Sequence, residues 1–130
     1  MIIKRKNCLQ TIELCPAKEV HLRTSGSYPS GHAAIGWLWG QIFSEISPEH
    51  SNKALVRGLE MGESRLICNV HWQSDVDAGR LMGSATFARL HANSEFTKAI
   101  KAAKLEISAV RSDGLKSSRD CKAETQSLTH

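Results

Sequence analysis

Apolar side chains recur at intervals of three and four residues in four stretches of the chain, which is the spacing of one helix face. The first stretch follows the segment Pro29-Ser30-Gly31-His32 and ends at Ser47-Pro48. Its apolar stripe is formed by Ile35, Leu38, Trp39, Ile42 and Ile46. The pattern predicts a helix over this stretch, and Pro48 suits the first turn of the next one.

The second predicted helix runs from about Glu49 to Arg65. One of its faces carries Leu55, Leu59, Gly62 and Leu66. Gly58 and Gly62 lie about one turn apart, so this side of the helix permits close packing against a neighbouring helix.

Two more helices are predicted downstream. Ser74 is the expected N-cap of the third, whose first turn holds Asp75 and Asp77, since acidic side chains are favourable at the positive end of a helix. This helix continues to Leu90 through Leu81, Met82, Ala85, Phe87 and Ala88. Ser94 is the expected cap of the fourth helix. The buried side of that helix is expected to carry Phe96, Ile100, Ala103, Ile107 and Val110.

The chain is predicted to be all-α, a helical bundle of about four helices. No segment alternates between apolar and polar residues at period two, which a half-buried strand would require. The predicted helices lie within residues 26–111, and an irregular segment of mixed charge, residues 1–25, precedes them. Residues 112–130 are polar and have no periodicity, so we expect a flexible polar tail.

The composition fits a small folded chain with a modest core: 130 residues, 41% hydrophobic and 23% charged. The longest stretch without Asp, Glu, Lys or Arg, residues 24–44, contains only eleven largely apolar residues in a row, 33–43. A membrane-spanning helix needs about 20, so none is predicted. Glu13, Lys18 and Glu19 interrupt the apolar core that a signal peptide would need, so none is expected in this chain.

The formal net charge of +4 is unevenly distributed along the chain. Residues 1–23 carry five Lys or Arg against two Glu, a net charge of +3. A basic arm for nucleic acid would explain this excess, but no aromatic side chains alternate with the basic ones and no nucleic-acid motif is present. A solvated basic face is the simpler interpretation, and no nucleic-acid partner is expected.

The segment around Ser30, Gly31 and His32 lies where a loop enters the first predicted helix. A helix N-terminus presents unpaired N–H groups and a partial positive charge, so it readily binds an anion. Gly31 allows a bound group to approach the backbone, Ser30 adds a hydroxyl donor, and His32 can transfer a proton near neutral pH. An ordinary N-cap followed by a surface histidine would explain the same residues.

A second segment with candidate chemistry covers residues 63–75. Arg65 offers a planar fork that suits two oxygens of a phosphate. His71 and Asp75 are four residues apart, so in helical geometry the carboxylate reaches one imidazole nitrogen. That hydrogen bond would fix the tautomer and leave the other ring nitrogen as a nucleophile or base. The alternative is a capping aspartate beside a histidine that is only hydrogen-bonded.

Together the two segments match two parts of a three-part signature. Pro-Ser-Gly-His is present at residues 29–32, and Ser-Arg, five residues, His, three residues, Asp is present as Ser64-Arg65, His71 and Asp75. The chain thereby resembles the bacterial class A non-specific acid phosphatases, in the type 2 phosphatidic acid phosphatase and vanadium haloperoxidase superfamily. Three stretches resemble class A in particular: GSYPSGH (26–32), RGLEMGESRLIC (57–68) and HWQSDVDAGR (71–80). The similarity extends from about Cys15 to about Val110.

The resemblance implies a phosphomonoester hydrolase that works through a phosphohistidine. His71 would attack phosphorus, Asp75 would orient it, and His32 would be the general acid. The substrate-binding residues would be Ser30, Gly31 and Arg65, which would hold the phosphoryl oxygens. The scheme implies no metal and no cofactor, and residues 26–111 would be the catalytic core of a larger helical acid phosphatase domain.

The remaining part of the signature, Lys, six residues, Arg-Pro, is missing. The chain has no Arg-Pro dipeptide, and Arg5, ten residues before Cys15 where the motif Arg would fall, is followed by Lys6. We therefore expect residues 1–25 to be divergent and the chain to be N-terminally truncated. An impaired or inactive fragment that lacks two phosphate-binding cations is the main alternative, and a vanadate-dependent haloperoxidase, disfavoured by the class A-like stretches, is another.

Further expectations concern the location of the protein, its partners and its cysteines. The resemblance implies a periplasmic location and, as partners, phosphomonoester substrates and inorganic phosphate, with no membrane. Helices missing before residue 26 would leave the first apolar stripe uncovered, so homo-oligomerisation through an exposed core is expected. The cysteines include no CxxC pair, so no zinc site is predicted. From position alone, Cys15 and Cys68 are expected to form a disulfide.

Overall fold

The computed structural model describes residues 26–115 and 121–127, and every regular element among them is a helix. In chain order these elements are α2 (Gly31–Ile46), the 3-10 helix η2 (Pro48–His50), α3 (Ser51–Ile67), α4 (Gln73–Leu90), α5 (Ser94–Ser112) and α6 (Cys121–Ser127). The all-α class and the four longer helices predicted from the sequence are confirmed. None of the described helices is both long and apolar enough to cross a membrane.

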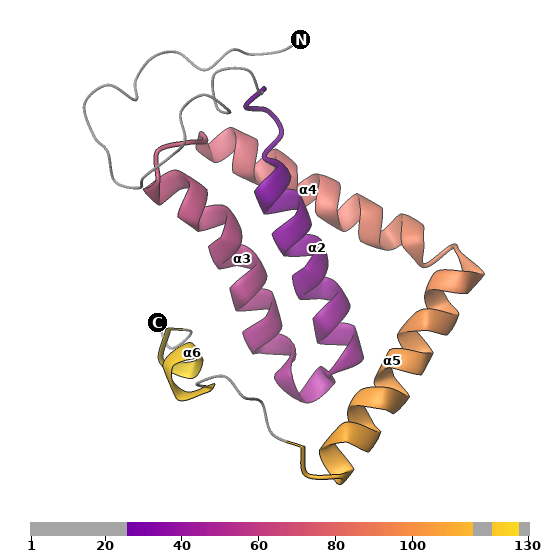
Figure 1. Cartoon of the computed structure of the whole chain (residues 1–130). Helices are drawn as coiled ribbons and strands as arrows, with labels where there is room; N and C mark the ends of the chain where they lie inside the picture. Colours follow the sequence, from indigo (N-terminus) through magenta and orange to yellow (C-terminus); the bar gives the residue numbers. More distant parts are fainter. Residues whose placement is uncertain (1–25, 116–120, 128–130) are drawn as a thin grey trace.

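Helix α2 is the centre of the arrangement. It lies between α3 and α4, and α5 turns back from the far end of α4 toward the C-terminal end of α2 (Figure 1). The N-terminal ends of α2 and α4 lie at the same end of the bundle, together with the C-terminal end of α3 (Figure 1). This end therefore brings together the two segments with candidate chemistry.

Small residues, and few large ones, form the contacts of α2 with its neighbours. Its buried positions are Ala33, Gly36 and Gly40. A Cβ at Gly40 would lie 3.3 Å from the Cα of Gly58 on α3, so the two backbones are in direct contact. On the other side, a Cβ at Gly83 of α4 would lie 2.6 Å from the carbonyl oxygen of Ala34. The close packing predicted for Gly58 and Gly62 is confirmed.

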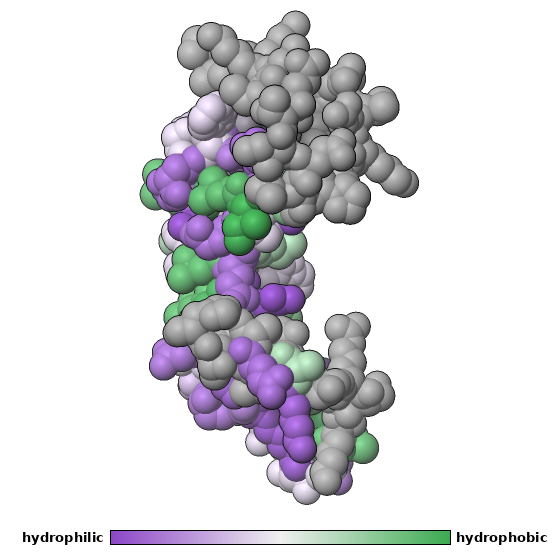
Figure 2. Space-filling view, turned by 90° about the vertical axis from the view of Figure 1, so that its left-hand side faces the viewer, coloured by the Kyte–Doolittle hydropathy of each residue, from purple (hydrophilic) through white to green (hydrophobic). Residues whose placement is uncertain are grey.

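The predicted apolar stripe of α2 is only partly buried. Ile35 is 54% exposed, and Trp39 and Phe43 are each 51% exposed, with their two rings stacked 5.4 Å apart. On α4 the exposure of Leu81 reaches 70%. Figure 2 views the molecule from its α3 side, where hydrophobic residues are also at the surface. The large apolar side chains flank the glycine contacts and leave much of their area in solvent, as expected for an uncovered stripe.

The helix ends differ from the predicted ones. The second helix begins at Ser51, after the 3-10 turn, and extends to Ile67. The N-cap of α4 is Trp72 and not Ser74, because the Asp75 carboxylate accepts the Trp72 N–H at 3.1 Å. The N-cap of α5 is Asn93 and not Ser94, and α6 lies within the segment expected to be a tail.

Helix α5 contacts the rest of the bundle through a buried apolar side chain and through hydrogen bonds between charged side chains. Of its predicted buried side, Ile100 is buried and Val110 is 36% exposed. Glu45, near the end of α2, accepts from Lys104 at 3.2 Å and contacts the ring Nε2 of His91 at 2.8 Å. His91 lies at the α4–α5 corner and makes edge contacts with Phe87 and Phe96. It is a surface histidine that links three helices.

The stability of this corner should depend on pH. The ring of His91 faces two acceptors, the carbonyl oxygen of Phe87 and the carboxylate of Glu45, which raise its pKa above 6.5, while Lys104 opposes the rise. The link is therefore complete below the ordinary pKa and is lost as pH rises through the raised one. Between about pH 6 and about pH 9 we expect the wild-type melting temperature to fall more than that of His91→Gln. Parallel melting curves for the two proteins across this range would contradict the prediction.

Candidate active site

The two signature segments meet at the N-terminal ends of α2 and α4. The Ser30 N–H donates to the carbonyl oxygen of Asp75 at 2.9 Å. Ser30 and Asp75 are both buried. Residues that are far apart in the sequence are thus joined by a direct backbone hydrogen bond, which fixes the start of α2 against the first turn of α4.

Asp75 has three hydrogen-bonding contacts on a single oxygen. Its Oδ2 accepts the Ser27 hydroxyl at 2.5 Å and the Trp72 N–H at 3.1 Å, and it lies 3.4 Å from the Nδ1 of His71. The side chains of His71 and Asp75 are 6% and 5% exposed. The structure therefore places the imidazole and the carboxylate side by side, at the spacing that the sequence indicated, in a site shielded from water.

The surroundings of Asp75 favour its ionised form. Burial alone would raise its pKa, but the hydrogen bonds from Ser27, the Trp72 N–H and His71 outweigh burial, so the pKa of Asp75 is lowered from 3.8. A carboxylate that accepts several hydrogen bonds commonly behaves in this way. Asp75 is therefore negatively charged in mildly acidic solution, where it favours a proton on the facing nitrogen of His71.

The start of α2 is open at Gly31 and His32, which directly follow the buried Ser30. Ser30 is the N-cap, and its hydroxyl oxygen accepts the Ala33 N–H at 3.4 Å. A Cβ at Gly31 would meet no atom within 4 Å, and His32 is exposed. Because the first N–H groups of a helix have no partner within the helix, this open end can bind an anion.

Arg65 lies in the last turn of α3, at the same end of the bundle. Its Nε donates to the Ser64 hydroxyl at 3.1 Å, and the side chain is half-buried. Within residues 26–115 and 121–127, Arg65 forms no ion pair with a carboxylate. Its charge is thus available to an anionic ligand, although the structure records no direct contact between Arg65 and His71.

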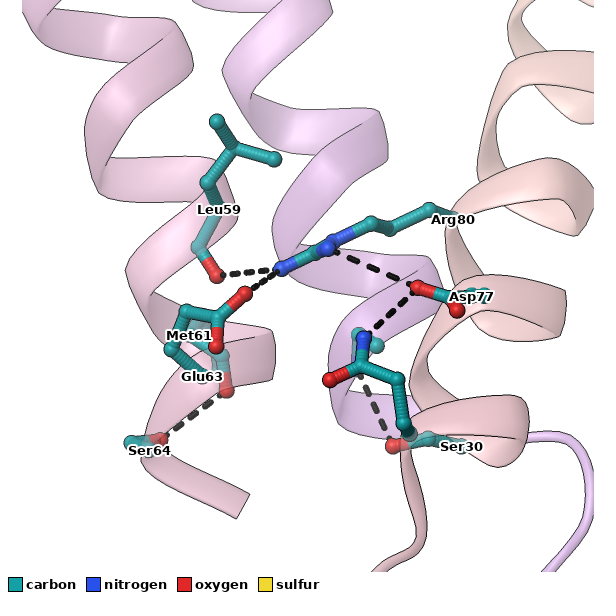
Figure 3. Close-up of polar contacts among 9 residues, drawn as sticks. Ser30, Leu59, Met61, Glu63, Ser64, Asp77 and Arg80 are labelled. Atoms are coloured by element: carbon teal, nitrogen blue, oxygen red, sulfur yellow. Dashed lines mark hydrogen bonds and ion pairs between the residues drawn. The ribbon is translucent and has the colours of Figure 1, made fainter. Parts of the chain in front are cut away.

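Sequence reasoning missed two polar residues near the site. The signature assigns no role to Ser27, and its place in the stretch GSYPSGH, just before the signature segment, is the one signal that points to it. Arg80 of α4 reaches across to α3, where it hydrogen-bonds the carbonyl oxygen of Leu59 at 3.3 Å and pairs with Glu63 (Figure 3). It is also 3.7 Å from Asp77. Arg80 therefore connects α4, which carries Asp75, with α3, which carries Arg65.

Some predicted features fall outside the described part of the chain. Cys68, directly after α3, is disulfide-bonded, but its expected partner Cys15 lies outside the described residues. Arg5, the suggested remnant of the missing motif, lies outside them as well. Within the described ranges, no cluster of three or more His, Cys, Asp or Glu side chains could hold a metal ion.

Comparison with known proteins gives consistent matches. The chain is 52% identical over 90 residues to a non-specific acid phosphatase of Providencia stuartii. The aligned region makes up 69% of this chain and 36% of that protein. It is 48% identical over 92 residues to a non-specific acid phosphatase of Salmonella typhimurium, an alignment that spans 71% of this chain and 37% of that protein. An acid phosphatase of Zymomonas mobilis is 40% identical over 99 residues, covering 75% and 38%. The chain thus spans little more than a third of the length of these relatives.

The family assignment rests on a longer match than the signature alone. The model of the PAP2 superfamily matches residues 6–97, which include both signature segments and the helices α2, α3 and α4 that position them. The resemblance inferred from the sequence is confirmed. The chain belongs to the PAP2 superfamily.

Proposed function

We propose that this chain is a phosphomonoester hydrolase, an acid phosphatase that acts through a phosphohistidine on His71. The observation that carries the proposal is the buried contact between His71 Nδ1 and the Asp75 carboxylate, 3.4 Å apart, beside the open N-terminus of α2. A proton held on Nδ1 puts the lone pair on Nε2, the atom that would attack phosphorus. The relatives named as acid phosphatases support the same reaction class.

The reaction would take two steps. In the first, His71 Nε2 forms a bond to phosphorus, the ester P–O bond breaks, and His32 gives a proton to the leaving alcohol oxygen. In the second, water attacks the phosphohistidine, His32 takes a proton from that water, and the N–P bond breaks to release phosphate. Arg65, the Ser30 hydroxyl and the Gly31 N–H would bind the phosphoryl oxygens and stabilise the charge that develops on them.

A chain that binds phosphate but hydrolyses little is the second candidate. Arg65 is the single cation supplied by the two signature segments, and the Lys and Arg of the third part of the signature are absent from the sequence. Loss of one such donor commonly lowers the rate by about 10²–10³, so the loss of two would leave little turnover. This candidate predicts that phosphate raises the melting temperature while no ester is hydrolysed.

Hydrolysis of p-nitrophenyl phosphate at mildly acidic pH separates the two candidates. We expect turnover by the purified chain, and a rate about 10²–10³-fold lower for Arg65→Ala. Arg89→Ala is the matched control, because Arg89 is an exposed arginine in the last turn of α4, at the other end of that helix from Asp75. A chain that hydrolyses no more ester than the buffer blank, yet is stabilised by phosphate, would reject the first proposal and support the second.

The disulfide on Cys68 bears on where the protein acts. Disulfides persist in oxidising compartments and are rare in the cytosol. Together with the acid phosphatase relatives of bacteria, this bond supports a periplasmic location. The substrates would be phosphomonoesters, with inorganic phosphate as the product, and neither nucleic acid nor a membrane is expected as a partner.

A further inference from the structure

Ser27 is a buried hydroxyl that contacts both members of the His71–Asp75 pair. Its side chain lies just before the first signature segment, and the residue is 2% exposed. The Ser27 Oγ donates to Asp75 Oδ2 at 2.5 Å and lies 3.4 Å from the Nδ1 of His71. The hydroxyl is therefore within reach of the carboxylate and the imidazole at once.

The chemistry of a hydroxyl group fixes the direction of these two contacts. Serine has one O–H to donate and two lone pairs that accept. Its proton goes to the carboxylate of Asp75, and 2.5 Å is the short distance typical of a hydroxyl donating to a charged oxygen. Toward His71, Ser27 then acts as an acceptor, so the contact requires the imidazole proton to be on Nδ1.

The direct contact between His71 and Asp75 is long, even with the Ser27 hydroxyl in place. The Nδ1 of His71 is 3.4 Å from Asp75 Oδ2 and equally 3.4 Å from Ser27 Oγ, so the ring proton faces both acceptors. Trp72 N–H also donates to Asp75, but it belongs to the same helix and fixes only the carboxylate. Ser27 is the described side chain that connects the loop before α2 with both residues.

We propose that Ser27 is a positioning residue, which holds the Asp75 carboxylate and, with it, keeps His71 in the Nδ1–H tautomer. The role of this tautomer in phosphoryl transfer rests on the proposed function, whereas the tautomer itself does not. In the proposed reaction, Ser27 does not touch the substrate. It acts through Asp75 and His71, and it ties the segment before α2 to the first turn of α4.

The experiment compares Ser27→Ala with Ser27→Thr in the full chain. Ala removes the hydroxyl, whereas Thr keeps it and is the conservative rescue. Nitrogen-15 spectra of the His71 ring report its tautomer directly, without any need for turnover. We expect Nδ1–H in the wild-type chain and in Ser27→Thr, and a mixture of tautomers in Ser27→Ala.

The pH profile of hydrolysis gives a second readout. We expect Ser27→Ala to lower kcat about 10- to 100-fold with little change in KM. The acid limb of its profile should move to higher pH, because a carboxylate that loses a donor has a higher pKa. Circular dichroism establishes that both variants are folded before they are compared.

The outcomes separate the two proposals. If the His71 tautomer is the same in Ser27→Ala as in the wild-type chain, the positioning role is wrong, whatever the hydrolysis rate. If the tautomer changes in Ser27→Ala but the wild-type chain hydrolyses no ester, Ser27 keeps its positioning role and the proposed function fails. A Ser27→Thr variant that behaves like Ser27→Ala, while folded, would also overturn the role of the hydroxyl.

Discussion

Replacement of His71 by Asn should lower the rate of phosphate-ester hydrolysis by at least about 10⁴-fold. Under the proposed mechanism, His71 Nε2 forms the one covalent bond between the protein and phosphorus, so no other group can replace it. Asn has a similar polarity and fits in the volume of the imidazole, and it leaves Asp75 with its donors from Ser27 and the Trp72 N–H. The loss should therefore be chemical and not a consequence of unfolding.

Phosphate labelling tests the same prediction at the level of the intermediate. A phosphohistidine survives alkali and is hydrolysed by acid, which distinguishes it from a phosphoserine. After rapid quenching of the reaction with a labelled phosphate ester, we expect alkali-stable, acid-labile phosphate on the wild-type chain and none on His71→Asn. His50→Asn is the matched control, because His50 is an exposed histidine in the turn between α2 and α3 and lies outside the signature. Equal hydrolysis by the wild-type chain and His71→Asn would show that His71 is not the nucleophile.

The sequence predicted the existence of the long helices and the close packing at Gly58 and Gly62, but not the packed face of α2. Periodic apolar residues located α2 well, yet the stripe with Ile35 and Trp39 is half-exposed. The packed side of the same helix carries Ala33, Gly36 and Gly40, because small residues let the α3 and α4 backbones approach. Periodicity reports which residues are apolar. It does not report which face another helix covers.

Capping explains the errors at the helix ends. Ser74 has the side chain preferred at an N-cap, so it was predicted there. The cap of α4 is Trp72, whose side chain has no acceptor to offer, and the Asp75 carboxylate in the first turn accepts the backbone N–H of Trp72 instead. The hydrogen bond at this helix start thus comes from a residue three positions after the cap. The same Asp75 oxygen accepts the Trp72 N–H and contacts His71.

The candidate site was predictable where its residues are close in the sequence. The spacing of His71 and Asp75 alone placed the imidazole near the carboxylate, because four residues span one helical turn. Ser27 meets Asp75 only through the packing of α2 against α4, and no local pattern reports such a contact. The expected association of chains through the exposed apolar side chains likewise stays a prediction, testable by sedimentation.

Gly79→Ala should destabilise the fold by about 2–3 kcal/mol, although alanine favours helices over glycine by about 1 kcal/mol. A Cβ at Gly79 would lie 2.5 Å from the carbonyl oxygen of Ser30 and 3.0 Å from the Cβ of Ala33. These are backbone or short, rigid groups that cannot move aside alone. The start of α2 would have to shift away from α4, and with it the Ser30–Asp75 hydrogen bond that joins the two signature segments.

Urea unfolding followed by circular dichroism measures this effect, with Gly31→Ala as the matched control. Both glycines are helical, but a Cβ at Gly31 would meet no atom within 4 Å, so its replacement should change the free energy of unfolding by no more than about 0.5 kcal/mol. The comparison isolates the contact, because the residue type and the substitution are the same. Equal stabilities of the two variants would mean that α2 and α4 are not packed this closely, and that Ser30 and Asp75 are not held together by backbone contact.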